Sequence, residues 1–426
     1  MKKNIDLDKL TNTTFLSSPQ TEKVYDYSAY DPFNEAKLLH IIPIEDDLYL
    51  LFDSTIFFPE EGGQTCDKGK ISFNLEGQSH ILDIIDVHLQ KIDKKEYIFH
   101  RIKGNDSEDI LNEAISKGII FSMEIDFDYR YSNMQNHTGE HIFSGIVKKE
   151  FGYDNVGFHL SDNSVTMDYN GPLTDSDVAR IEEEVNYVIA QNFPVYCSYP
   201  GKDELIDLDY RSKIEIDGPI RIVEIPGVDT CACCAPHVYS TCEVGHLIVL
   251  SSTSYKGGTR LSILCGDRAN KYIKDNQNML FALSHTLKLP FEDLQGAVEK
   301  MQKEIYDLKI DISNMQSDML KMKLKSLPAT GNICICVKDT DSKVKRDCIN
   351  ELKLNRDGYI MILDSKENSR SYVLGSRDKN CNDFLKEISD RLIIKGGGKP
   401  EMIQGSIESD NETIINVLKQ NNFTII

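Results

Sequence analysis

Two pairs of potential metal ligands constrain the fold of this chain more than any other feature. The first pair, His137 and His141, lies in MQNHTGEHIFSG, within a segment expected to be helical. Residues four apart on a helix project from the same face, so both imidazoles can reach one metal ion. The second pair, Cys233 and His237, has the same spacing in CACCAPH. A mixed nitrogen and sulfur set suits Zn²⁺, so we predict one zinc ion per chain, held by all four residues.

Two other interpretations of these segments stay open. One places a separate structural zinc in the second segment, held by Cys231, Cys234, His237 and Cys242. That site would leave the first histidine pair without further ligands. The other takes His137, Glu140 and His141 as the H-x-x-E-H pattern of inverted zinc proteases, in which the glutamate is the general base. The downstream cysteine and histidine are surplus ligands in such a protease, so Glu140 is expected on the helix surface instead.

Composition narrows the class of protein. A chain of 426 residues with 27% charged and 40% hydrophobic residues is typical of a globular protein of several domains. Its eleven cysteines are an odd number and do not suggest a secreted disulfide framework. The start, MKKNIDLDKL, lacks the apolar stretch of a signal peptide, and no apolar run is long enough to span a bilayer. We therefore expect a cytoplasmic protein with no membrane partner.

The order of β-rich, mixed and helical runs along the sequence predicts an α+β multidomain protein with four segments. Short β-rich runs between turn residues predict a small β-barrel domain over residues 1–118. Mixed runs predict an α+β domain with the zinc site over residues 119–267. Residues 268–327 read as helical, and residues 328–426 read as β-α-β, which predicts a C-terminal α/β domain. The three glycines of KGGGKPEMIQGS in this last domain are expected to form a close-approach turn.

Helices are expected around residues 130–150, from Thr174 to Asn192, at 268–287, and from Phe291 to Lys325. The segment Thr-Asp-Ser-Asp at the start of the second is favourable N-cap chemistry. The fourth has apolar residues at alternating steps of four and three, the seam of a coiled coil. These residues are Leu294, Val298, Met301, Ile305, Leu308, Ile312, Met315, Met319 and Met322. Its partner is either the helix at 268–287 or a second subunit, which would make a homodimer.

Several motifs together resemble a known family. FDSTIFFPEEGGQTCDKG, IDFDYRYSNMQNHTGEH, VGFHLS and YKGGTRLSILCGDRA resemble segments of the editing domain of alanyl-tRNA synthetases and of their free-standing relatives, the AlaX proteins. The tail with GGGKPEMIQG is similar to the DHH-associated domain of these synthetases and of long AlaX proteins. The resemblance spans roughly residues 22–426 and includes no aminoacylation domain. It implies a cytoplasmic, zinc-dependent hydrolase that deacylates mischarged tRNA(Ala) without synthetase activity.

The resemblance also assigns site residues. The substrate implied is chiefly seryl-tRNA(Ala), with glycyl-tRNA(Ala) as a lesser candidate, and tRNA is the expected partner. By motif position Thr55 reads the serine hydroxyl, while Gln64 and Gln135 are weaker candidates for contacts with the terminal adenosine or the amino acid at the catalytic centre. The remaining substrate-binding candidates are Gly62, Gly63, Lys256 and Arg260.

Three features fit the resemblance poorly. Glu61 stands where the family has the first of three glycines, and Cys234, Ala235 and Pro236 replace Gly-Gly-Thr beside the second ligand pair. A formal net charge of −20 disfavours non-specific phosphate binding, although a local basic face is compatible with it. A zinc peptidase and a non-catalytic tRNA-binding module with structural zinc therefore stay as alternatives.

Overall fold

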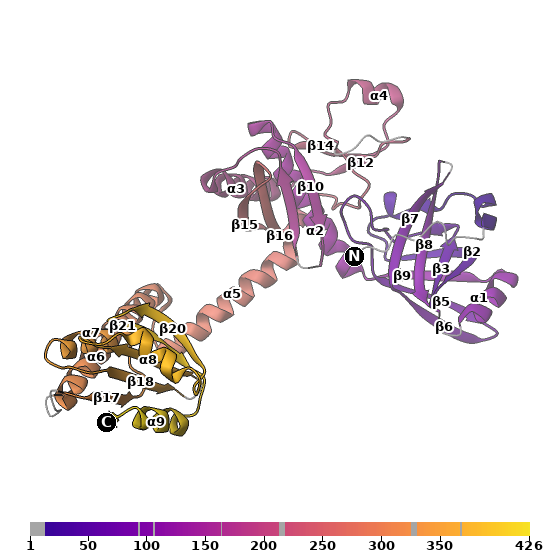
Figure 1. Cartoon of the computed structure of the whole chain (residues 1–426). Coiled ribbons are helices and arrows are strands. Elements are labelled where there is room, and N and C mark those ends of the chain that lie inside the picture. The colour runs from indigo at the N-terminus through magenta and orange to yellow at the C-terminus, as the bar shows by residue number, and fades with distance from the viewer. Residues whose placement is uncertain are drawn as a thin grey trace. The chain divides into compact units, whose positions relative to one another are not determined.

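The computed structural model describes residues 13–92, 94–104, 107–162, 164–212, 218–324, 330–366 and 369–426. The chain divides into two compact units, Met1–Met279 and Leu280–Ile426 (Figure 1). The first unit contains the segments with the candidate metal ligands. The two units are described separately below.

Seven antiparallel strands form the N-terminal sheet, in the order β6-β5-β9-β2-β3-β8-β7. They are β2 (Phe33–Ile44), β3 (Asp47–Phe52), β5 (Gly69–Leu75), β6 (Gln78–Ile84), β7 (Asp86–Ile92), β8 (Lys95–Lys103) and β9 (Ile120–Ile125), with helix α1 (Ser107–Ser116) before the last. Aromatic and branched side chains favour strands and here pack into one core that includes Phe52, Phe73 and Phe121. The sheet extends past residue 118, because β9 pairs with β2 and β5. A closed barrel stays a prediction.

A short parallel pair, β1 (Glu22–Lys23) with β4 (Ser54–Thr55), places Thr55 beside this sheet. The turn that contains Gly62 and Gly63 follows β4. Three-residue to five-residue 3₁₀ turns complete the first unit, at Thr13–Ser17, Val24–Asp26 and Thr241–Val244.

A second antiparallel sheet, ordered β10-β11-β16-β15, packs against helices α2 and α3. Its strands are β10 (Asn155–Leu160), β11 (Val165–Tyr169), β15 (Leu247–Tyr255) and β16 (Gly258–Cys265). Alternate residues such as Met167 and Ile263 are buried against the helices, as period-two side-chain alternation requires. A three-stranded sheet of β12 (Tyr196–Ser198), β13 (Ile222–Ile225) and β14 (Asp229–Ala232) lies nearby, and α4 (Lys202–Asp207) follows β12.

Helix α2 (Phe127–Phe151) positions the candidate site (Figure 1). It begins after Asp126, whose side chain accepts a hydrogen bond from the backbone N–H of Tyr129 at 3.0 Å, and it ends at Gly152 in the left-handed conformation. Every residue from 133 to 147 is buried. Because this stretch has no solvent face, each of its polar side chains needs a partner inside the protein.

Helix α3 (Asp175–Gln191) begins with a capping box, as the sequence predicts. Thr174 accepts from the backbone N–H of Asp177, whose carboxylate accepts from the backbone N–H of Thr174. The buried side chains of α3, among them Ile181 and Val185, join the core that α2 forms with the second sheet.

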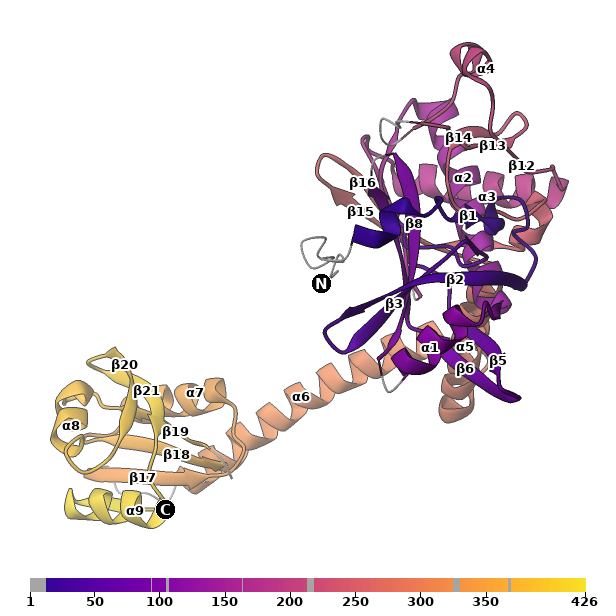
Figure 2. The ribbon, with the colours of Figure 1, turned by 90° about the vertical axis from the view of Figure 1, so that its right-hand side faces the viewer.

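In the second unit a six-stranded mixed sheet is covered by helices on both faces (Figure 2). Ile333 and Ile335 pack with α7, whereas Cys334, between them, packs in the core of α8 and α9. Strands β17 and β18 are parallel and are connected through α7, which gives a β-α-β unit. The elements are β17 (Asn332–Val337), β18 (Ile360–Lys366), β19 (Ser369–Gly375), β20 (Ile394–Lys399), β21 (Met402–Ile407), β22 (Phe423–Ile425), α7 (Ser342–Lys353), α8 (Cys381–Ile388) and α9 (Asn411–Gln420).

The glycine run of this unit is a strand and not the turn expected from the sequence. Residues 396–398 lie in β20, and the turn is formed by Pro400 and Glu401. A β-carbon on Gly396, with φ of 146°, would lie 2.3 Å from the backbone oxygen of Gln404. Close approach of the neighbouring strand β21 therefore explains the glycine at this position.

Two long helices connect these parts of the sequence. They are α5 (Gly266–Leu287) and α6 (Leu294–Leu324), separated by a 3₁₀ turn at Phe291–Asp293. The apolar seam expected on α6 is exposed in the single chain, with Ile305 53% and Met315 66% accessible. The coiled coil and its partner stay predictions. None of the described helices has the length and apolar character needed to cross a membrane.

A buried ion pair joins α2 to the N-terminal part of the chain. Arg130 and Asp67 are both fully buried, and Arg130 Nε lies 2.9 Å from Asp67 Oδ1. The same guanidinium donates to the backbone oxygens of Ala29 at 3.1 Å and Ile56 at 2.6 Å. One side chain therefore ties three segments of the N-terminal part to the helix of the candidate site.

We expect Asp67→Ala to lower the unfolding free energy of this unit by about 3–5 kcal/mol, because it leaves the Arg130 charge buried without its counterion. Hydrogen exchange of the α2 amides measures the change. The double variant Asp67→Leu/Arg130→Met should recover most of it. Glu113→Ala, which removes an exposed partner of Lys117, is the control and should leave α2 exchange unchanged. Equal exchange in Asp67→Ala and the wild type would contradict this role.

Candidate metal centre

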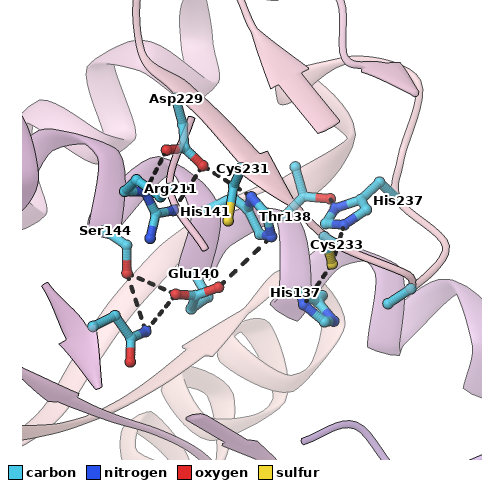
Figure 3. A network of polar contacts seen from close by, with 12 residues as sticks. His137, Thr138, Glu140, His141, Ser144, Arg211, Asp229, Cys231, Cys233 and His237 are labelled. Atoms are coloured by element: carbon cyan, nitrogen blue, oxygen red, sulfur yellow. Dashed lines mark hydrogen bonds and ion pairs between the residues drawn. The ribbon is translucent and has the colours of Figure 1, made fainter. Parts of the chain in front are cut away.

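The two ligand pairs meet at one point. His137 and His141 come from α2, and Cys233 and His237 come from the segment after β14 (Figure 3). One donor atom from each lies within 4.8 Å of those of the others. Cys233 Sγ lies 3.5 Å from His137 Nε2 and 3.4 Å from His237 Nε2. The four side chains can therefore enclose a single metal ion, as the sequence pattern requires.

Each histidine has its other ring nitrogen, Nδ1, held by a partner outside the cluster. A donated Nδ1–H fixes the tautomer and turns the Nε2 lone pair toward the centre, the usual outer arrangement of histidine metal ligands. The partners are Gln64 Oε1 for His137 at 2.7 Å, Asp229 Oδ2 for His141 at 2.9 Å and Thr138 Oγ1 for His237 at 3.0 Å.

Charges around the centre favour the ionised forms of Asp229 and Cys233. Arg211 Nε and Nη2 each lie 2.7 Å from a carboxylate oxygen of Asp229 (Figure 3). Burial alone raises the pKa of Asp229, but the hydrogen bonds from His141 and Arg211 hold it below its ordinary value. Burial also opposes ionisation of Cys233, yet the neighbouring imidazoles, His137 first, hold its pKa well below that of a free thiol. A thiolate is the form that binds metal.

Glu140 is buried, so the expectation that it lies on the helix surface is wrong. Its side chain is 1% exposed, because this part of α2 is enclosed on all sides. Oε1 accepts from Ser144 Oγ at 2.6 Å and from Asn155 Nδ2 at 2.5 Å. Oε2 lies 3.9 Å from His141 Nε2. The glutamate is therefore a fixed part of the surroundings of the centre.

The alternative ligand set in the cysteine-rich segment does not form. Two groups of three or more potential ligands occur in the described part of the chain, and neither contains Cys234 or Cys242. Cys242 is exposed, and its sulfur lies 3.3 Å from Ser240 Oγ. The second group, His141, Asp229 and Cys231, shares a histidine with the first.

Thr55 is fully buried and its hydroxyl has defined partners. His100 donates from Nδ1 to the backbone oxygen of Leu50 at 3.3 Å, which leaves Nε2 to accept from Thr55 Oγ1 at 2.7 Å. Thr55 Oγ1 in turn accepts from the backbone N–H of Phe57 at 3.0 Å. Burial lowers the pKa of His100 to about 4, so the ring is neutral at physiological pH. One lone pair of the threonine hydroxyl is left for another donor.

The two glutamines proposed from the sequence have different surroundings. Gln64 is fully buried and contacts the ligand His137. Gln135 donates to the backbone oxygen of Glu243 at 2.9 Å and accepts from the backbone N–H of Asp267 at 3.4 Å. Gln64 is thus part of the candidate metal centre, whereas the amide of Gln135 connects two backbone segments around α2.

The remaining candidates lie on two turns. Gly62 and Gly63 have positive φ, and a β-carbon on Gly63 would lie 2.4 Å from the backbone oxygen of Phe158, so this turn needs glycine. Lys256 lies in the exposed turn between β15 and β16. Arg260, on β16, has both its Nε and Nη2 2.6 Å from the carboxylate of Asp168. Its charge is therefore already paired with an acid.

Sequence reasoning missed the residues that hold the ligands in place. Thr138, Arg211 and Asp229 contact the centre or its partners, yet no spacing rule identifies them. The only available signal is Asp229 in DTCAC, a carboxylate four residues before Cys233. His100 could not be identified from the sequence either, because the pairing of distant strands brings it to Thr55.

Comparisons with known proteins add a family context. A family model described as the threonyl and alanyl tRNA synthetase second additional domain matches residues 220–262, which contain Cys233 and His237. Among solved structures, the C-Ala domain of Aquifex aeolicus alanyl-tRNA synthetase shows a slight likeness, with 17% identity and a TM-score of 0.19, over 21% of this chain and 86% of that one.

Relatives by sequence cover far more of the chain. Alanyl-tRNA editing protein AlaX-L of Pyrococcus horikoshii is 28% identical, over 93% of this chain and 97% of its own length. Alanyl-tRNA editing protein Aarsd1 of Danio rerio is 25% identical over 83% of each chain. Alanine–tRNA ligase of Methanococcus vannielii is 27% identical, over 94% of this chain but 43% of the ligase. The chain is thus a relative of the alanyl-tRNA editing proteins over nearly its whole length.

Proposed function

We propose that this chain is a zinc-dependent aminoacyl-tRNA deacylase that hydrolyses the ester of mischarged tRNA(Ala), chiefly seryl-tRNA(Ala) and secondarily glycyl-tRNA(Ala). The observation that carries the proposal is the buried cluster of three histidines and one cysteine. Its support comes from the length of the match to proteins named for alanyl-tRNA editing. The match covers 97% of AlaX-L but 43% of the ligase, so deacylation is the activity proposed.

The residues of the centre fit zinc. Zn²⁺ takes four nitrogen and sulfur ligands in tetrahedral geometry, and His137, His141, Cys233 and His237 are a set of this kind. Bound zinc would supply Lewis-acid activation of a water molecule or of the ester carbonyl. Four protein ligands describe a closed site, so chemistry at the metal requires one ligand to be displaced. Otherwise a bound metal would have only the structural role of shaping the pocket.

Discrimination between serine and alanine is proposed to rest on Thr55. A synthetase pocket shaped for alanine cannot strongly reject a residue that adds only a hydroxyl, whereas a second site that hydrogen-bonds the hydroxyl can select it. His100 and the Phe57 N–H fix the orientation of the Thr55 hydroxyl and leave one lone pair. A serine hydroxyl can donate to that lone pair. Alanine would leave it without a partner.

The tRNA and the second subunit are further parts of the proposal. Lys256 is exposed on its turn and can meet phosphate, but Arg260 contributes less because Asp168 pairs with it. The exposed seam on α6 supports a homodimer through residues 294–322. The C-terminal α/β unit is proposed to contact tRNA.

The first test removes the metal. Cys233→Ser and His141→Ala should reduce both bound zinc and the deacylation of seryl-tRNA(Ala) by more than about tenfold, because each removes a ligand. Metal analysis and release of labelled serine measure the two quantities together. A strong chelator should give the same loss in the wild type. Cys242→Ser, which changes an exposed cysteine outside the cluster, is the control and should keep both.

The alternatives predict different activities. A zinc peptidase predicts peptide cleavage that Glu140→Gln abolishes while Cys233→Ala preserves it. A non-catalytic module predicts binding of tRNA without release of serine. Either result would contradict the deacylase.

The second test concerns the partner of His141. Asp229→Ala should lower zinc affinity about 10- to 100-fold, because it removes the acceptor that orients the ring. Competition with a chromogenic chelator measures the affinity. Asp168→Ala is the matched control, since Asp168 also forms a two-point ion pair with an arginine but contacts no ligand. Unchanged affinity in Asp229→Ala would show that the tautomer is fixed by other means.

The third test concerns selectivity. Thr55→Val should lower kcat/KM for seryl-tRNA(Ala) about 10- to 100-fold relative to alanyl-tRNA(Ala), because valine keeps the shape but not the hydroxyl. Thr55→Ser should keep the selectivity. Thr21→Val is the control, since Thr21 is another buried hydroxyl, bonded to the Phe52 oxygen and the Ile98 N–H. A selectivity ratio equal to that of the wild type would remove Thr55 from the proposal.

A further inference from the structure

The turn of residues 60–64 lies against the metal centre at two points. At one end, Gln64 Oε1 lies 2.7 Å from Nδ1 of the ligand His137. In the middle, a β-carbon on Gly62 would lie 3.3 Å from the sulfur of Cys234, the neighbour of the ligand Cys233. Side chains of this turn are therefore placed next to the reaction centre. Glu61 directly precedes Gly62 in this turn.

Polar atoms around this turn lack hydrogen-bond partners within the described part of the chain. They are Glu61 Oε2, Tyr25 Oη and Gln64 Nε2, all of them buried. Tyr25 is 1% exposed and Gln64 is fully buried. Buried polar atoms without partners are rare in native proteins because each costs free energy, and a water, an ion or a ligand usually completes their bonding.

Tyr25 and Cys234 pack in one hydrophobic cluster, and Gly62, the neighbour of Glu61, approaches the sulfur of Cys234. Burial raises the pKa of the Tyr25 hydroxyl, with additional contributions from the nearby carboxylates of Asp26 and Glu61. The free oxygen of the carboxylate and the free phenol hydroxyl thus belong to one small region beside the centre.

The lysines nearby are held mainly by another acid. Lys91 Nζ lies 2.7 Å from Glu96 Oε1 and 3.7 Å from Glu61 Oε1. Lys23 Nζ lies 2.6 Å from Glu96 Oε2. Lys91 is also 60% exposed, so water screens its charge. Glu61 Oε2 is therefore left without a hydrogen-bond donor in the described part of the chain. A cationic donor forms the strongest hydrogen bond to a carboxylate oxygen.

We propose that Glu61, together with the hydroxyl of Tyr25, binds the α-ammonium group of the aminoacyl ester. This inference rests on the proposed deacylase function and deepens it. The α-ammonium is the one cationic group of a seryl ester, and it is attached to the carbon next to the reacting carbonyl. Glu61 lies three residues before Gln64, the partner of the ligand His137, and its carboxylate is placed to meet this group. The site then requires a free amine on its substrate and excludes N-acylated aminoacyl-tRNA.

The test compares seryl-tRNA(Ala) with N-acetylseryl-tRNA(Ala) on the full-length, zinc-loaded protein. We expect the wild type to prefer the free amine by about 10- to 100-fold in kcat/KM, the range of a charge-assisted hydrogen bond. Glu61→Gln should lower kcat/KM for seryl-tRNA(Ala) by the same factor and leave N-acetylseryl-tRNA(Ala) within about twofold. Lys91→Met is the matched control and should keep the preference. A Lys91→Met variant that behaves like Glu61→Gln would overturn the inference, because Glu61 would then serve only the lysine.

A binding measurement separates recognition from catalysis. The probes are the 3′-amide analogue of seryl-adenosine, which is not hydrolysed, and its N-acetyl derivative, both measured by calorimetry. The wild type should bind the free amine about 10- to 100-fold more tightly, and Glu61→Gln should bind both equally. The wild-type comparison stands even where a variant does not fold.

The outcomes distinguish the role of Glu61 from the deacylase function on which it rests. A wild type that hydrolyses both tRNA substrates at equal rates and binds both probes equally overturns the role of Glu61 and keeps the deacylase. A wild type that hydrolyses neither overturns the deacylase, and the role of Glu61 falls with it.

Discussion

Burying three imidazoles and a thiol at one point requires a partner for every ring nitrogen, and the surroundings of α2 supply one for each Nδ1 atom. Gln64, Thr138 and Asp229 take the Nδ1 positions, which leaves the Nε2 atoms to face Cys233. These partners come from three separate parts of the chain: the glycine-containing turn, α2 itself and β14. The centre therefore exists only when the folded parts of the first unit are assembled around α2. The geometry of the ligands therefore depends on the tertiary structure of this unit.

The same dependence explains the buried ion pair at the start of α2. Arg130 has no direct contact with the metal ligands, but it fixes the helix against Asp67 and the backbone at Ala29 and Ile56. The turn that supplies Gln64 ends three residues before Asp67. Movement of α2 relative to this segment would separate His137 from its partner. Stability of the unit and orientation of the ligands are thus linked through a few buried polar contacts.

Local patterns predicted the parts of the site that have a period. Spacing of four on a helix identified His137 and His141, and capping chemistry placed the start of α3 at Thr174. The heptad pattern placed α6, because its apolar residues recur over many turns. Features set by distant strands or by enclosure escaped prediction. Glu140 is buried because α2 is surrounded, Gly396 lies in a strand because β21 approaches its backbone, and Asp229 reaches His141 through tertiary packing. A single sequence carries no periodic signal for any of these.

The position of Thr55 has a consequence for how selectivity can change over evolution. Its hydroxyl is oriented by His100 and by backbone groups within the packed interior of the N-terminal sheet, with Phe52 and Phe57 edge-on to the His100 ring. Mutations that alter the proposed amino-acid preference must therefore pass through the same close-packed interior that keeps this part folded. Most such mutations would destabilise the protein, and selection would remove them before it could act on their effect on substrate choice.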